Sequence, residues 1–378
     1  MEDRMRTVPF RLSAMIAATL ILTACAGIGT VNTAPKPVEQ VVRNTAVYDM
    51  SRRAPADRDG YQPPNKLAVL LPLSGNAAAA AKPVRDGFLV AYYNEQRARP
   101  PIKLYDTAQG VSAAYAKAVA DGSDYVVGPL LRDEVSSLFA KPDAELRVPV
   151  LALNRAQAAT PGGSVSFALT PEDEALAIAN AMYGANLKHV LVFTTSDATQ
   201  RRAAGAFVAQ YKLQNAVAGT PVLVNVKSET LAADIAAAVA AETQANGKID
   251  GVFFSARGDV VRAVVPLLAG TPVATAPRMA TSQIQLGNAG ATDMAVLDGI
   301  RFPLEYDAES QGAGKAASRL RDFGNDAWLI TAYLGRIASG EHRLNGATGK
   351  LGLNNSGLIV RDPEWAVYRN GVPATAAR

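Results

Sequence analysis

Cysteine and histidine are nearly absent from this chain, whose 378 residues include one Cys and two His. A zinc site, a Cys–His dyad and a disulfide framework each need more of these side chains than the sequence offers. The single Cys25 lies near the N-terminus, and a cysteine-free remainder suits an oxidising compartment. We therefore expect no metal ion and no cofactor.

A strong net charge is missing as well. The chain has 38 basic and 34 acidic side chains, which give a formal charge of +4. No run of Lys and Arg with interleaved aromatic residues occurs, so we expect no nucleic-acid partner. The apolar share of 49% and the length are instead typical of a globular protein large enough for two lobes.

Catalytic motifs are also absent. The sequence contains neither the GxSxG elbow of serine hydrolases nor the GxxxxGK[ST] loop that binds phosphate. We interpret His189 and His342 as surface or helix-terminal residues, and the acids at 172–174 as the start of a helix, where carboxylates are favoured. We predict that the protein is not an enzyme.

The N-terminal segment is typical of an export signal. Three arginines (Arg4, Arg6 and Arg11) precede an apolar run at residues 12–22, which is too short to span a membrane as a helix. A buried helix is the alternative, but the run has no amphipathic face and leads into a polar segment. We predict a signal peptide at residues 1–24 and a flexible, proline-containing tether at 25–64.

The tetrapeptide Leu22-Thr23-Ala24-Cys25 resembles the lipobox of bacterial lipoproteins. That resemblance implies cleavage before Cys25 and lipidation of this residue, which would anchor the protein to a membrane without spanning it. Ala26, rather than an Asp, at the next position implies sorting to the outer membrane. We therefore expect a protein anchored on the periplasmic face of the outer membrane.

The body of the chain alternates short apolar runs with helical patterns. Runs at residues 67–71, 125–127 and 148–153 are typical of strands buried in a parallel sheet. After a break near residues 155–170 the alternation restarts, with apolar runs that include residues 189–193 and 251–254. The pattern predicts an α/β protein with two doubly wound parallel-sheet lobes.

Several segments resemble the LppC-type penicillin-binding protein activators. These segments are LAVLLPLSG at 67–75, DYVVGPL at 124–130, DAWLITAYL at 326–334 and GATGKLGLNNSG at 346–357. The resemblance covers about residues 66–371 and implies a type I periplasmic-binding-protein fold, whose chain crosses between lobes three times. It places residues 65–168 and 306–341 in the first lobe, and residues 169–305 and 342–378 in the second.

Proteins of this family are outer-membrane lipoproteins that stimulate class A, bifunctional penicillin-binding proteins, which build peptidoglycan. The resemblance therefore implies an enzyme regulator with such a synthase as its partner. The best-known relatives carry a large helical-repeat domain before this one, where here the segment at 26–64 stands. The fold is equally compatible with a lipid-anchored solute-binding protein of an ABC transporter for amino acids or amides.

Ligands of doubly wound folds bind beyond the carboxyl ends of the strands, so a cleft between the lobes is the expected place for one. The residues that would contact a ligand there follow predicted strands, and they are Ser74, Gly75, Asn154, Thr281 and Ser282. Ordinary turn chemistry explains each of them equally well. Because no charged side chain is committed to ligand capture, we expect the cleft to be largely idle.

Overall fold

A computed structural model describes residues 48–156, 158–287, 290–304, 313–340 and 343–376. All of these residues belong to one unit, Pro37–Arg378. The predicted signal peptide, Cys25 and the first part of the predicted tether lie outside the described residues, as does His342. Among the residues described, no helix combines the length and the apolar character that crossing a membrane requires.

The first lobe is built on a five-stranded parallel sheet with the order β2-β1-β3-β4-β5. Alternate side chains of β1 enter different cores: Val69 and Leu71 pack on one face, and Ala68 and Leu70 on the other. Burial on both faces explains why β1 appears in the sequence as an uninterrupted apolar run. The strands are β1 (Leu67–Leu71), β2 (Ile102–Asp106), β3 (Tyr125–Val127), β4 (Val150–Ala152) and β5 (Val165–Ser166).

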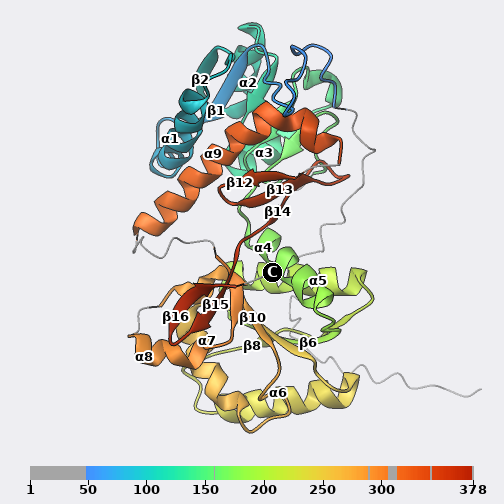
Figure 1. Ribbon diagram of the computed structural model, residues 1–378, viewed down its shortest axis with the longest axis vertical. Helices are drawn as coiled ribbons and strands as arrows, with labels where there is room; N and C mark the ends of the chain where they lie inside the picture. Colours follow the sequence, from blue (N-terminus) through green and yellow to red (C-terminus); the bar gives the residue numbers. More distant parts are fainter. Residues whose placement is uncertain (1–47, 157, 288–289, 305–312, 341–342, 377–378) are drawn as a thin grey trace, which may run out of the picture. The chain divides into compact units, whose positions relative to one another are not determined.

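Helices cover both faces of this sheet (Figure 1). On one face, α2 (Val111–Ala120) and α3 (Arg132–Phe139) pack over the core that contains Val135 and Leu138. The opposite face carries α1 (Ala78–Asn94) and the long α9 (Ala313–Ala338), which lie side by side. A short 3-10 helix, η1 (Asp143–Glu145), precedes β4.

Two glycines allow α1 and α9 to touch backbone to backbone. A Cβ atom on Gly87 would lie 1.9 Å from the carbonyl oxygen of Arg321, and one on Gly324 would lie 1.9 Å from that of Val84. Any larger side chain would push the helices apart, so this close crossing requires glycine at both positions.

A three-stranded antiparallel sheet, in the order β12-β13-β14, also belongs to the first lobe. Its strands are β12 (Leu344–Gly346), β13 (Gly349–Leu353) and β14 (Ile359–Asp362). Leu344, Leu351 and Ile359 pack in the same core as α1 and α9. The prediction that all of residues 342–378 lie in the second lobe is therefore wrong, because this segment completes the first-lobe core.

Residues 48–64, which we call the N-terminal strap, are packed on the first lobe rather than free. Tyr48 and Met50 lie against its core, and Tyr61 is 4% exposed. The guanidinium of Arg53 donates to the carbonyl oxygens of Gln62 and Thr331, at 2.8 and 3.0 Å. The predicted end of the flexible tether at residue 64 is thus wrong, since folded structure begins by residue 48.

The second lobe contains a mixed eight-stranded sheet with the order β16-β15-β11-β10-β9-β6-β7, in which β8 also pairs with β6. Strands β6 to β11 pair in parallel, whereas β15 and β16 are antiparallel additions at one end. The strands are β6 (His189–Thr194), β7 (Val217–Ala218), β8 (Val222–Leu223), β9 (Gly251–Ser255), β10 (Arg278–Ala280), β11 (Arg301–Pro303), β15 (Trp365–Arg369) and β16 (Val372–Thr375).

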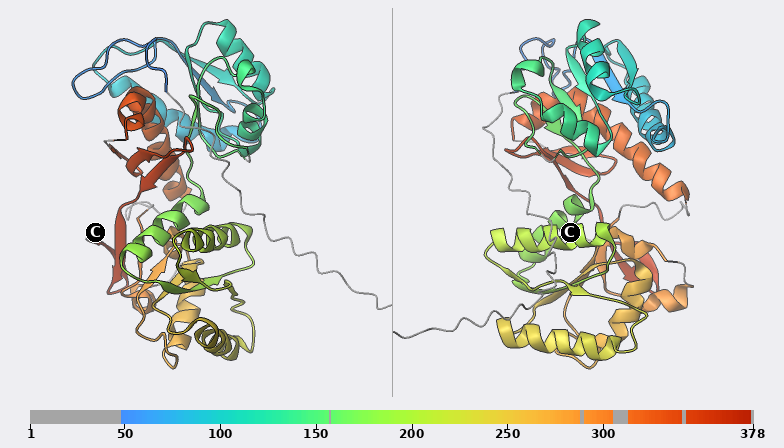
Figure 2. Two further views of the ribbon diagram at one scale, coloured as in Figure 1. Left: turned by 90° about the vertical axis from the view of Figure 1, so that its right-hand side faces the viewer. Right: turned by 180° about the vertical axis from the view of Figure 1, so that it is seen from behind.

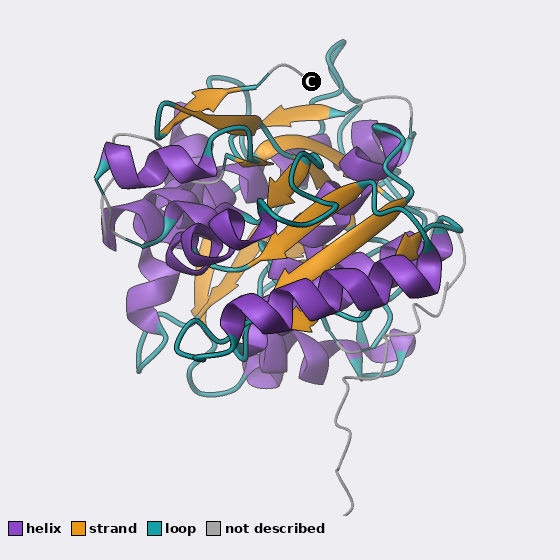
Figure 3. Ribbon diagram, turned by 90° about the horizontal axis from the view of Figure 1, so that it is seen from below, coloured by secondary structure: helices purple, strands orange, loops and turns teal. Residues whose placement is uncertain are grey.

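Alternation along β6 again divides the side chains between two cores, with Val190 and Val192 on one face and Leu191 and Phe193 on the other. Figure 2 shows the sheet running between α5 and α6, and Figure 3, the view from below, shows a long helix lying in front of the strands. The helical elements of this lobe are α4 (Pro171–Gly184), α5 (Ala198–Leu213), α6 (Leu231–Asn246), α7 (Gly258–Val264), η2 (Val265–Leu268), η3 (Ser282–Gln285), α8 (Ala291–Met294) and η4 (Ala295–Leu297).

The chain passes between the lobes three times, as the family resemblance implied. These passages lie between β5 and α4, between β11 and α9, and between β14 and β15. The prediction of two doubly wound parallel-sheet lobes is confirmed. The third passage lies at residues 363–364, later than predicted, because β12–β14 belong to the first lobe.

Candidate functional site

In the first lobe, Ser74 and Gly75 form the turn after β1. The Ser74 hydroxyl donates to Asp106 Oδ2 at 2.6 Å, and the backbone N–H groups of Leu73 and Ala108 donate to Oδ1 at 2.8 and 3.0 Å. These bonds, led by the one from Ser74, lower the pKa of Asp106 to about 2. Gly75 has φ = 72°, a conformation that disfavours other residues. Both residues thus fulfil turn roles.

Asn154, after β4, is also engaged within its own surroundings. Its side-chain Nδ2 donates to the carbonyl oxygen of Leu130 at 3.0 Å, and its Oδ1 accepts from the backbone N–H of Arg155 at 2.9 Å. The amide therefore ties the end of β4 to the loop that follows β3.

In the second lobe, Thr281 and Ser282 follow β10 and are 1% and 0% exposed. The Ser282 hydroxyl donates to Glu174 Oε2 at 3.0 Å, and its backbone N–H donates to Oε1 of the same carboxylate. The buried Thr281 Oγ1 has no hydrogen-bond partner. These residues are buried parts of the lobe rather than exposed ligand contacts.

The acids at the start of α4 have structural partners. Thr170 is the N-cap, and its Oγ1 accepts from the backbone N–H of Asp173 at 3.2 Å. Glu172 accepts from Arg202 Nε at 2.9 Å, and Asp173 forms an ion pair with Arg155. The interpretation of these acids as a helix start is confirmed.

His189 is buried, contrary to the expectation of a surface or helix-terminal residue. Its Nε2 lies 2.9 Å from Glu242 Oε1 and its Nδ1 lies 2.9 Å from the carbonyl oxygen of Lys248. The side chain is a fixed element of the β6 start. Within the described residues, no three His, Cys, Asp or Glu side chains gather as a metal site would require.

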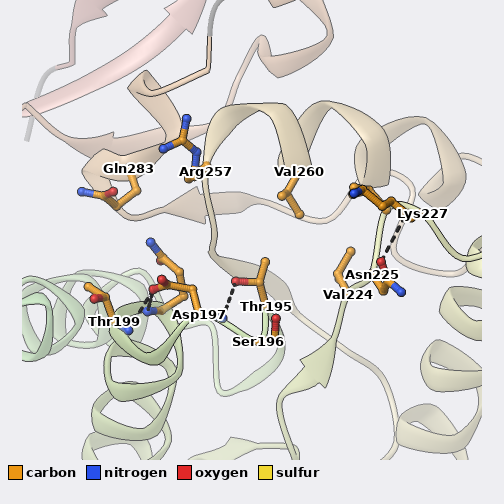
Figure 4. A pocket seen from close by; sticks show the side chains of 12 residues that line it. Thr195, Ser196, Asp197, Thr199, Val224, Asn225, Lys227, Arg257, Val260 and Gln283 are labelled. Atoms are coloured by element: carbon orange, nitrogen blue, oxygen red, sulfur yellow. Dashed lines mark hydrogen bonds between the residues drawn. The ribbon is translucent and has the colours of Figure 1, made fainter. Parts of the chain in front are cut away.

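A pocket of about 550 Å³ lies wholly in the second lobe (Figure 4). It opens where β6, β8 and β9 end, which is the edge at which doubly wound sheets bind ligands. Four segments supply its polar wall: the β6–α5 turn, the segment after β8, the start of α7, and η3. The polar residues are Thr195, Ser196, Asp197, Thr199, Gln200, Asn225, Lys227, Arg257 and Gln283.

Local bonds hold much of this wall in place. The Asp197 carboxylate caps α5 by accepting from the backbone N–H groups of Thr199 and Gln200, at 2.8 and 3.0 Å. Asn225 Oδ1 accepts from the backbone N–H of Lys227 at 3.1 Å. Lys227 and Arg257 are exposed cations on the lining.

None of the five predicted cleft residues lines this pocket. Three of them, Ser74, Asn154 and Ser282, use their side chains for bonds within their own lobe. The residues that sequence reasoning missed, such as Thr195 and Asp197, directly follow the apolar strand β6. That polar run after a predicted strand was the available signal, but it is equally typical of an N-cap.

The fold and the pocket define a class of protein, namely two-lobed α/β proteins of the type I periplasmic-binding-protein kind. Its family is shown by the model described as "LppC putative lipoprotein", which matches residues 60–371. The chain belongs to this family, and the resemblance stated from its motifs is confirmed.

Known relatives agree with this family. The chain is 25% identical over 401 aligned residues to "Penicillin-binding protein activator LpoA" of Yersinia pseudotuberculosis, which covers 81% of this chain and 60% of the relative. It thus spans about 60% of the length of that relative. The LpoA C-domain from Haemophilus influenzae, described as a regulator of PBP1A, superposes with a TM-score of 0.69 at 24% identity, covering 82% of this chain and 100% of that domain.

A transporter-type structure has a related fold. The "putative branched-chain amino acid ABC transporter" from Chromobacterium violaceum superposes with a TM-score of 0.60 at 25% identity, covering 80% of this chain and 99% of that chain. The shared fold therefore includes both regulators and transport proteins.

Proposed function

We propose that this protein is a non-catalytic lipoprotein that activates a class A penicillin-binding protein and so regulates peptidoglycan synthesis. The observation that carries the proposal is the family match over residues 60–371, together with relatives that bear the name of penicillin-binding protein activators. Cys25 is the proposed lipidation site, and the periplasmic face of the outer membrane is the proposed location.

The predicted cleft residues use their side chains for hydrogen bonds within their own lobe, which supports regulation of a partner protein rather than binding of a small molecule. The side chains of Ser74, Asn154 and Ser282 hold turns and strand ends in place. An activator must bind the active conformation of its partner more tightly than the resting one, and a differential of about 1.4 kcal/mol changes the population ratio tenfold.

The test is glycan polymerisation and cross-linking by each purified class A synthase of the same organism, with and without the full chain purified from membranes in detergent. We expect the full chain to bind one synthase and to raise its rates severalfold. Intact-mass measurement of the same preparation should show acyl groups on Cys25. Unchanged rates together with no binding, for every class A synthase, would reject the activator function.

The second-lobe pocket favours one other candidate, a solute-binding function for amino acids or amides. Calorimetric titration of the same preparation with these compounds separates the two functions. A saturable heat with one of them, alongside unchanged synthase rates, would replace the activator with a transport protein.

A further inference from the structure

Exposed apolar side chains are concentrated in one short part of the second lobe. Of the eight large apolar side chains that are exposed among the described residues, four lie between residues 213 and 226. They are Leu213 at 79% exposure, Val217 at 39%, Leu223 at 60% and Val226 at 44%. Scattered single residues of this kind are normal on a protein surface, whereas such a concentration is typical of an interaction site.

This segment forms the end of the eight-stranded sheet, at β7 and β8 beside β6. The backbone N–H of Val224 donates to the carbonyl oxygen of Thr194 in β6 at 2.7 Å. Because backbone groups alternate in direction along a strand, the N–H and C=O of Leu223 point away from β6. No further strand of the described residues pairs with this side, so the edge is open to an added segment.

The charged residues within this segment have one sign, although carboxylates flank it, namely those of Asp197, Glu229 and Glu242, the last of which lies beside Gly219. The sequence contains no acidic residue between Asp197 and Glu229, but four basic ones, namely Arg201, Arg202, Lys212 and Lys227. Arg202 is paired with Glu172, whereas Lys212 and Lys227 are exposed. Lys227 follows Val226 directly and lines the same pocket as Arg257. At the exposed Lys227, a partner that presents carboxylates together with apolar groups therefore fits this surface.

We infer that residues 213–227, the edge segment, are the docking surface for an extended stretch of the synthase that carries apolar side chains and carboxylates. This inference rests on the proposed function. The stretch lies along β8 and bonds to the outward backbone groups of Leu223, as in strand addition. Its apolar side chains cover Leu223 and Val226, and its carboxylates pair with Lys227.

The shortness of β8 decides how this contact behaves. Two residues in the strand provide few backbone bonds, so apolar burial and the charges of the edge segment must supply most of the affinity. Exposed charge pairs are screened by salt, with a Debye length of about 10 Å at 0.1 M. Association with the synthase should therefore weaken as ionic strength rises.

The experiment measures binding of the class A synthase by surface plasmon resonance and its rates in the polymerisation assay, with Leu223→Ser and Lys227→Glu in the full chain. Each substitution should weaken binding about tenfold, equivalent to about 1.4 kcal/mol, and lower activation in parallel. Both residues are exposed, so thermal unfolding should match that of the unsubstituted protein.

Matched controls lie at the other end of the same sheet. Val372 in β16 is 52% exposed and Arg369 in β15 is exposed. The substitutions Val372→Ser and Arg369→Glu therefore repeat the chemical changes on a different edge, and they should leave binding within about twofold of the unsubstituted chain.

Three results would overturn the inference. If the unsubstituted chain activates the synthase and both edge variants do so equally well, the docking surface is elsewhere while the proposed function stands. If the edge variants instead abolish self-association in sedimentation analysis and leave synthase binding intact, the segment binds a second copy of this chain. Failure of the unsubstituted chain to bind any class A synthase would reject both proposals.

Discussion

The two lobes share a winding pattern but differ in what lies at the edges of their sheets. In the first lobe, a bridge between Ser166 and Leu358 joins the β5 side to the segment that follows β13, and the N-terminal strap packs on the same core. In the second lobe, β15 and β16 extend one edge, whereas the other ends in the two-residue strands β7 and β8. Both lobes therefore use later chain segments at one edge of the sheet, and among the described residues each sheet also ends in strands with an unpaired side, β2 in the first lobe and β7 and β8 in the second. The second-lobe edge differs because exposed apolar side chains are concentrated there, between residues 213 and 226.

The packing around helix glycines also differs between positions in the two lobes. Backbone contact between α1 and α9 at Gly87 and Gly324 leaves no room for a side chain, whereas Gly205 in α5 has open space around the position of a Cβ. Close packing at a glycine also occurs in the second lobe, where a Cβ on Gly258 would lie 2.2 Å from the carbonyl oxygen of Ile284, so the contrast is between these helix positions.

The largest expected effect comes from testing these glycines with the same chemical change. Gly324→Ala places a Cβ 1.9 Å from the carbonyl oxygen of Val84, and only a shift of the helices can relieve this contact. We expect the free energy of unfolding to fall by about 3 kcal/mol. Gly205→Ala should raise it by about 0.5 to 1 kcal/mol, because alanine favours a helix.

One tryptophan in each lobe allows the unfolding of each lobe to be measured separately. Trp328 is buried in the first lobe and Trp365 in the second. Urea unfolding is followed by fluorescence in a Trp365→Phe background for the first lobe and a Trp328→Phe background for the second. Equal losses of stability from both glycine substitutions would contradict the contrast between the two positions.

A smaller effect is expected at the N-terminal strap. Arg97 donates to both oxygens of Asp59, at 3.1 and 2.9 Å, and its guanidinium lies 3.8 Å from the centre of the Tyr61 ring. Arg97→Ala should release the strap locally, at a cost of about 1 to 2 kcal/mol. Amide exchange at Gln62, whose N–H donates to the Ala332 carbonyl oxygen at 2.8 Å, should then accelerate about tenfold.

Arg58 provides the matched control, because it is an exposed arginine of the same strap. Arg58→Ala should leave the exchange of the Gln62 amide unchanged. If Arg97→Ala also leaves it unchanged, Arg97 is not what fastens the strap, and the bonds of Arg53 suffice.

The sequence predicts the parallel sheets better than the chain ends. Burial on both faces gives strands such as β1 and β6 continuous apolar runs, which mark them clearly. Leu344, Leu351 and Ile359 lie on short antiparallel strands that share the first-lobe core through contacts distant in sequence. No local periodicity reveals which of two sheets such a segment joins, so the third passage between lobes was misplaced.

The candidate site was harder to predict for a related reason. Ser74, Asn154 and Ser282 do follow strands, as expected, but whether a hydroxyl or amide faces a ligand depends on its bonding partner. The partners Asp106 and Glu174 lie 32 and 108 residues away in sequence. Such pairings depend on tertiary structure, which a strand-end pattern does not specify.

The smallest expected effect concerns the turn after β1, where the first lobe satisfies its own polar groups. The Ser74 hydroxyl is the foremost cause of the low pKa of Asp106, which is about 2 against an ordinary value of 3.8. Because the folded-state pKa is depressed, the ionised carboxylate stabilises the turn above about pH 4, and this contribution is lost as the pH falls through 2.

Ser74→Ala should raise the pKa of Asp106 towards 3.8, although the N–H groups of Leu73 and Ala108 should keep it lower. Titration of the carboxyl carbon by NMR measures this change, and Ser74→Thr, which retains the hydroxyl, should restore the low value. An unchanged pKa in Ser74→Ala would mean that the backbone donors alone keep the pKa of this carboxyl low.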